Sequence, residues 1–150
     1  MPVKFYEQDI SAKLKNKRKL SAYLEKLARK HLKVKATRLA YIFCSDDHLH
    51  KMNRQFLNHD TLTDIITFDM SEFNDTLEGE MYISIERVKD NAEKFGVSYA
   101  DELHRVIFHG ALHLCGFKDK KDADIKEMRK QEAKCLKDYT KFKETEAINK

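Results

Sequence analysis

Two histidines and an aspartate in the last third of the chain have the residue types and the spacing of a metal site. His109 and His113 are four residues apart in a stretch predicted to be helical, so both imidazoles lie on one helix face. Gly116 ends that helix, and the turn after it can return Asp119 to the same face. Two imidazole nitrogens and a carboxylate oxygen, with a fourth position open, are typical of a catalytic zinc ion. The spacing predicts one Zn²⁺ per chain on His109, His113 and Asp119.

Each of these residues also has an ordinary structural interpretation. His113 can be a core histidine bonded to backbone, and Asp119 can be a turn residue or the cap of a following helix. Cys115 is a soft ligand in type but falls on another helix face, where a small buried thiol is the simpler interpretation. Gly110 stands where a zincin protease has its glutamate base, which argues against a peptidase and predicts open space beside the metal.

Hydrophobic periodicity predicts the elements that must position these residues. Strands are predicted over residues 3–6, 37–44, 63–69 and 81–86. Helices are predicted over residues 15–32, 46–56, 87–95, 98–115 and 121–139. The remaining segments are predicted to be a turn at 58–61, a polar connection at 71–78 and a frayed tail from 141 onward. This order predicts an α+β domain over residues 1–150, with a small mixed four-stranded sheet, about five helices and a zincin-like metal helix.

Composition and charge narrow the class of protein. With 36% charged residues and no apolar run near the ~20 residues that span a bilayer, a membrane protein is excluded. No signal-peptide pattern opens the chain, so a cytoplasmic location is expected. Residues 1–38 hold twelve Lys and Arg against three acids, which favours a polyanion such as RNA, or else marks a solvated surface helix. Residues 55–86 hold eight acids and no Lys or Arg.

The segment from His109 to Asp119 resembles the signature of the YbeY family of bacterial rRNA-maturation endoribonucleases. That signature reads His-Gly-x-Leu-His-Leu-x-Gly-Tyr/Phe, and a third metal-binding histidine follows two residues after the aromatic position. Further matches are the segments 63–68 and 79–83, and the pair Met128 and Glu132 in the last helix. The resemblance implies a small mixed sheet with helices and a zinc site close to the sheet.

This sequence departs from the family pattern at two positions. Asp119 replaces the third histidine, and its carboxylate lowers the positive charge at the metal. Leu57 stands where the family has an arginine linked to activity. The candidate catalytic residues are therefore Arg54, which can replace that cation, and His59, which suits proton transfer or is an ordinary turn histidine.

The resemblance implies a metal-dependent endoribonuclease that cuts single-stranded RNA in small-subunit rRNA maturation and ribosome quality control. The expected partners are small-subunit rRNA and ribosomal particles, with no membrane and no DNA. The alternative is a non-catalytic, zinc-containing ribosome-assembly factor, favoured by the missing arginine, the acidic stretch and the carboxylate ligand. RNA cleavage with and without a chelator separates the two.

Overall fold

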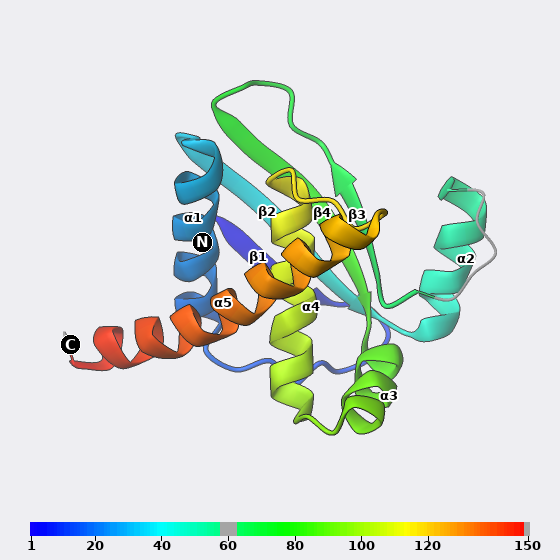
Figure 1. The fold of residues 1–150 in the computed structure, drawn as a ribbon. Coiled ribbons are helices and arrows are strands. Elements are labelled where there is room, and N and C mark those ends of the chain that lie inside the picture. The colour runs from blue at the N-terminus through cyan, green and yellow to red at the C-terminus, as the bar shows by residue number, and fades with distance from the viewer. Residues whose placement is uncertain (58–62, 149–150) are drawn as a thin grey trace.

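The computed structural model describes residues 1–57 and 63–148, which form a four-stranded sheet and five helices (Figure 1). The strands are β1 Val3–Glu7, β2 Ala36–Cys44, β3 Ile65–Asp69 and β4 Thr76–Ser84. The helices are α1 Lys17–Leu32, α2 Asp46–Leu57, α3 Ile85–Phe95, α4 Tyr99–Leu114 and α5 Asp122–Ile148. The predicted α+β class and the predicted order of elements are confirmed.

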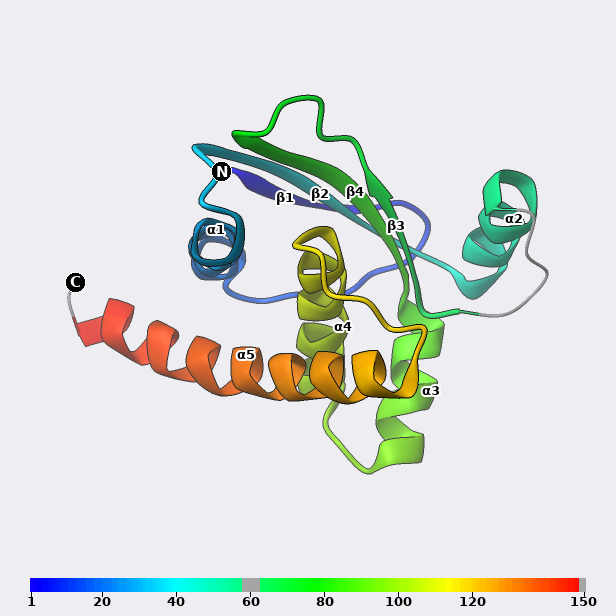
Figure 2. The same cartoon turned by 45° about the horizontal axis from the view of Figure 1, so that its top comes forward.

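The sheet is mixed and has the strand order β1-β2-β4-β3. β1, β2 and β4 are parallel, whereas β3 pairs antiparallel with β4. The apolar faces of α1 and α4 pack on one side of this sheet, and α5 crosses α4 on the side away from the strands (Figure 2). α2 lies at the β3 edge over a small separate cluster of Cys44, Leu49 and Ile66. α4 is therefore the central helix, enclosed between the sheet and α5.

Alternation of buried and solvent-facing residues extends β4 further back than predicted. Leu77, Gly79 and Met81 are buried, while the acidic residues between them face outward. The stretch 71–78 was predicted to be a connection because it is acidic, but its last three residues belong to this strand. At the other end Ser84 closes the strand and caps α3, where its side chain accepts a hydrogen bond from the Arg87 amide.

The last helix is also longer than predicted. It continues to residue 148, although the chain was predicted to fray from residue 141 onward. Phe142 explains part of this extension, because its ring packs on Tyr23 of α1 with centroids 5.7 Å apart. Met128 and Cys135 of this helix are buried, whereas Ile125 near its start is 41% exposed. The turn predicted over residues 58–61 lies outside the described residues.

Candidate metal and polar site

The second half of α4 packs closely against the sheet, and capping residues define both ends of this helix. Ser98 caps its first turn, since the Ser98 hydroxyl accepts a hydrogen bond from the Asp101 amide. Gly116, at a φ of +104°, ends it in the left-handed region that suits glycine. Gly110 is buried against the strands, where a Cβ would lie 2.8 Å from Ile65 Cδ1. The expectation that Gly110 opens space beside a metal is therefore wrong, because this glycine allows the helix to approach the sheet.

The His109 imidazole lies between two carboxylates. Its Nδ1 is 2.6 Å from Oε2 of Glu132, which α5 brings over the helix and which is 1% exposed. Its Nε2 is 3.4 Å from Oδ2 of Asp119, in the connection between α4 and α5. The spacing had predicted that Asp119 returns to the helix face beside His109, and the structure brings the two side chains together.

Arg105, one helical turn before His109, neutralises the buried carboxylates. Its Nε and Nη2 donate to both oxygens of Glu102 at 2.9 and 2.7 Å, and its Nη1 donates to Oε1 of Glu132 at 2.9 Å. Asp64 lies 3.6 Å from the same guanidinium. One arginine is therefore shared by three carboxylates from α4, α5 and the segment that leads into β3.

The pKa shifts in this network follow from burial and from these pairs. Burial alone would raise the pKa of the Glu132 carboxyl, but the hydrogen bond from His109 and the charge of Arg105 hold it below its ordinary value. Burial raises the pKa of Asp64, against the opposing charge of Arg105. Burial disfavours the charged Arg105, yet its hydrogen bonds to Glu102 and Glu132 raise its pKa.

An ionised Glu132 fixes the proton on the His109 ring. A carboxylate only accepts hydrogen bonds, so Nδ1 must carry the proton and donate it. In the neutral ring Nε2 then presents a lone pair toward the Asp119 carboxylate, 3.4 Å away. Two electron-rich groups at this separation favour a cation between them, and metal-binding histidines are oriented by a carboxylate on the other nitrogen in this way. The donor set at His109 therefore fits a zinc ion.

The third predicted ligand is less close. His113 lies on the same helix, one turn beyond His109, and is exposed. Among the residues that the structure describes, no three His, Cys, Asp or Glu side chains are arranged as a metal site. Zinc binding by His109, His113 and Asp119 stays a prediction.

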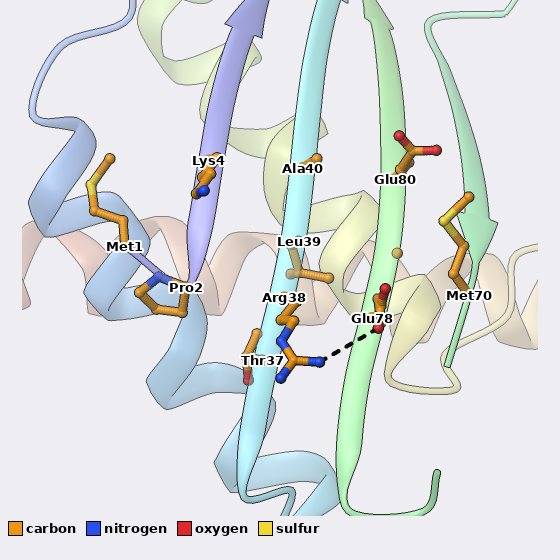
Figure 3. A pocket seen from close by; sticks show the side chains of 11 residues that line it. Met1, Pro2, Lys4, Thr37, Arg38, Leu39, Ala40, Met70, Glu78 and Glu80 are labelled. Carbon is orange, nitrogen blue, oxygen red and sulfur yellow. Dashed lines mark ion pairs between the residues drawn. The ribbon is translucent and has the colours of Figure 1, made fainter. Parts of the chain in front are cut away.

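Two shallow cavities adjoin His109, with volumes of about 210 and 230 Å³. His109, Asp119 and Arg129 line both, and Glu132 lines the first while Arg105 lines the second. A cavity of about 530 Å³ lies instead on the open face of the sheet, between β1, β2 and β4 (Figure 3). None of the predicted site residues that the structure describes lines that larger cavity, so volume does not locate the chemistry here.

Of the two predicted catalytic residues, Arg54 does not join this site. Arg54 is exposed on α2, and it lines neither of the cavities beside His109. His59 lies outside the described residues.

The sequence prediction missed Arg105 and Arg129. A signal for Arg105 was present, since Arg105, His109 and His113 recur every four residues along one helix face.

Comparison with known proteins agrees with the resemblance seen in the histidine segment. A family model described as Endoribonuclease YbeY matches residues 3–140. Proteins called Endoribonuclease YbeY from Cytophaga hutchinsonii and Parabacteroides distasonis are 47% and 41% identical to this chain. The first alignment covers 85% of this chain and 89% of the relative, and the second covers 91% and 94%. A relative of the same name from Flavobacterium johnsoniae is 56% identical over 61% of this chain and 66% of its own length.

A solved structure has the same fold. The solution structure of TM1509 from Thermotoga maritima superposes with a TM-score of 0.63 and 25% identity, covering 99% of this chain and 95% of that one. The sequence and structural matches together extend from β1 to α5, well beyond the histidine segment that first indicated the relationship. The chain therefore belongs to the YbeY endoribonuclease family.

Proposed function

We propose that this protein is a zinc-dependent endoribonuclease that cuts single-stranded RNA during maturation of small-subunit rRNA and in ribosome quality control. The observation that carries the proposal is the His109 imidazole, whose Nδ1 is held by buried Glu132 while its Nε2 faces Asp119 in a cavity. The relatives named Endoribonuclease YbeY support the reaction class. The acting form is proposed to be cytoplasmic and to meet its RNA on ribosomal particles; no described helix is long and apolar enough to cross a bilayer.

The metal is proposed to sit on Nε2 of His109, the Asp119 carboxylate and the imidazole of His113. A zinc ion there supplies Lewis-acid polarisation of a phosphoryl oxygen and makes bound water more acidic. The protein's own part is positional. Glu132 fixes the proton on Nδ1 of His109, and Arg105 fixes Glu132, so the Nε2 lone pair stays directed into the cavity.

We also propose that the basic residues in and before α1 bind RNA, away from the cavities beside His109. Lys15, Lys17, Arg18, Lys26 and Lys30 are exposed, whereas the opposite face of this helix is buried in the core. Charge reversal at Lys15, Arg18 and Lys19 is expected to weaken binding to every RNA sequence. The slope of log affinity against log salt should fall by about 0.7 for each phosphate that the variant no longer neutralises. An unchanged slope would make this helix an ordinary solvated surface.

The decisive experiment compares cleavage of one labelled RNA in single-stranded and duplex form, with zinc and with chelator. It is run with and without small-subunit particles. We expect metal-dependent cleavage of the single strand, abolished in His109→Asn. If the wild type keeps its zinc but cuts neither RNA in any condition, the non-catalytic assembly factor replaces the enzyme.

A second variant tests Asp119 as a ligand. Asp119→His replaces an anionic ligand by a neutral one, so the metal stays bound and its water becomes more acidic. The pH optimum of cleavage should then move downward, whereas Asp119→Ala should loosen the metal. If Asp119 only capped α5, the alanine change would cost about 0.5–2 kcal/mol of stability and leave zinc in place.

A further inference from the structure

The two sides of the cavities beside His109 differ in charge, and this difference limits which side chains can bind an RNA phosphate. The strand side is contributed by Thr63, Asp64 and Ile65, and residues 55–86 contain no Lys or Arg. Asp64 and Asp119 add negative charge to the second cavity, which repels a phosphodiester. Besides the proposed zinc ion, the Lys and Arg side chains that line the two cavities are Arg105 and Arg129, both from helices.

The first of these arginines is fully occupied. The Arg105 side chain is only 16% exposed. Three of its nitrogens donate to Glu102 and Glu132 at 2.7–2.9 Å. Turning it toward a substrate would leave two buried carboxylates without their counter-charge, which is strongly unfavourable.

The second arginine is free to turn. Arg129 on α5 is 57% exposed, and its Nη1 donates to Oε1 of Glu132 at 3.1 Å. That oxygen already accepts from Arg105, and the other oxygen of Glu132 is bonded to His109. A guanidinium has five N–H donors, and the described residues offer the other four of Arg129 no partner. Arg129 also lines both cavities beside His109 and Asp119.

We propose that Arg129 is the residue that binds the RNA phosphate at this site, donating to its non-bridging oxygens above His109 and Asp119. Arg105 is then a positioning residue, which neutralises Glu132 so that Arg129 keeps its charge for the substrate. A planar guanidinium suits the two oxygens of a phosphodiester better than an ammonium does. The inference rests on the proposed RNA-cleaving function and assigns it a residue on α5, in place of Arg54 on α2.

The test uses the full chain with Arg129→Gln and Arg129→Lys, and Lys130→Gln as the matched control. Lys130 is the next residue on α5, is exposed and lines neither cavity. Cleavage kinetics are measured on single-stranded RNA with zinc, and binding of the same strand is measured in chelator over a salt series. Zinc affinity and melting temperature are measured on every variant.

Arg129→Gln should lower kcat/KM about 10- to 100-fold, as expected when a charge-assisted hydrogen bond is removed. It should also reduce the salt slope by about 0.7, with zinc affinity and melting temperature unchanged. Arg129→Lys should keep the slope and recover part of the rate, and Lys130→Gln should behave as wild type. Wild-type rate and slope in Arg129→Gln would overturn the inference while leaving the enzyme in place. If the wild type cuts no RNA, the proposed function fails, and the salt slope alone decides whether Arg129 binds phosphate.

Discussion

Two histidines five residues apart on α4 have opposite surroundings. His104 lies among rings, with its centroid 5.3 Å from that of Tyr139 and 6.3 Å from that of Phe108. His109 instead lies between the carboxylates of Glu132 and Asp119. The same residue type on the same helix is therefore a packing element at one position and a candidate ligand at the other.

The difference comes from α5, which crosses α4 (Figure 2). Its first half places Glu132 and Arg129 over His109, and its second half places Tyr139 and Lys143 near His104. Burial and the nearby Lys143 lower the pKa of His104, with Asp101 opposing them, so this ring stays neutral. The surroundings of each histidine are thus set by the part of α5 that covers it.

Removing the Glu132 carboxylate, which lies where α5 crosses His109, should lower the free energy of unfolding more than any other change considered below. Glu132→Ala leaves Arg105 and the His109 ring without their buried acceptor, and breaking a buried pair costs about 3–5 kcal/mol. Urea unfolding at neutral pH measures this destabilisation. Glu127→Ala on the exposed side of α5 is the control and should stay within about 0.5 kcal/mol of wild type. A Glu132→Ala protein as stable as its control would show that the network does not stabilise the fold.

A milder change at the same residue should separate metal binding from stability. Glu132→Gln keeps the size of the side chain but no longer offers His109 an ionised acceptor, so the Nε2 lone pair is not assured. Removing such a supporting carboxylate lowers metal affinity about 10- to 100-fold. Competition with a zinc-binding dye measures it, and His104→Phe should retain the wild-type affinity. Equal zinc affinity in Glu132→Gln would remove His109 from the metal site.

The fold could be predicted from the sequence to a greater extent than the site. Periodicity located every element because each buries an apolar face, and the largest errors in the element bounds lie where polar residues hide the pattern. The start of β4 was missed because acidic residues alternate with Leu77 and Gly79, and the end of α5 was missed because residues 140–148 are mostly polar. His109 and Asp119 could be paired because they are close in the chain.

The partners of His109 from other elements could not be predicted in this way. Glu132 lies 23 residues further along the chain, and its contact depends on where α5 crosses α4. Arg105 meets both Glu132 and Asp64 only after helix and strand have packed. Spacing along one helix therefore predicts candidate ligands, whereas the charges that tune them come from tertiary packing.

His104, which packs on Tyr139 of α5, should make the stability of the fold depend on pH. Because the folded state holds the pKa of His104 below its ordinary value, the unfolded chain takes up the proton first as the pH falls below about 6.5. The contribution of neutral His104 to the free energy of unfolding is therefore fully present above about pH 7. It declines on acidification, by at most about 1.4 kcal/mol per pH unit for one proton. Lys13, Lys15 and Lys143 line a cavity beside His104, and the positive charge of Lys143 opposes protonation of the ring.

His104→Phe should remove this part of the pH dependence, because Phe keeps a ring against Tyr139 and carries no proton. Unfolding free energies at pH 7.5 and 5.5 give the slope for each protein. The variant should lose less stability than wild type between the two values. An identical decline in both would mean that His104 is as free to protonate in the fold as in the unfolded chain.

The smallest effect is expected at Tyr139, on the same aromatic side. Its hydroxyl is buried and has no hydrogen-bond partner among the described residues. The ring itself packs on Tyr23 and Phe108, with centroids 5.4 and 5.8 Å away. Tyr139→Phe keeps the ring and removes an unsatisfied polar atom, so stability should stay unchanged or rise by up to about 1 kcal/mol. Thermal unfolding measures the shift. A destabilisation above about 1 kcal/mol would mean that this hydroxyl has a partner, and that α5 makes a polar contact on its aromatic side as it does at Glu132.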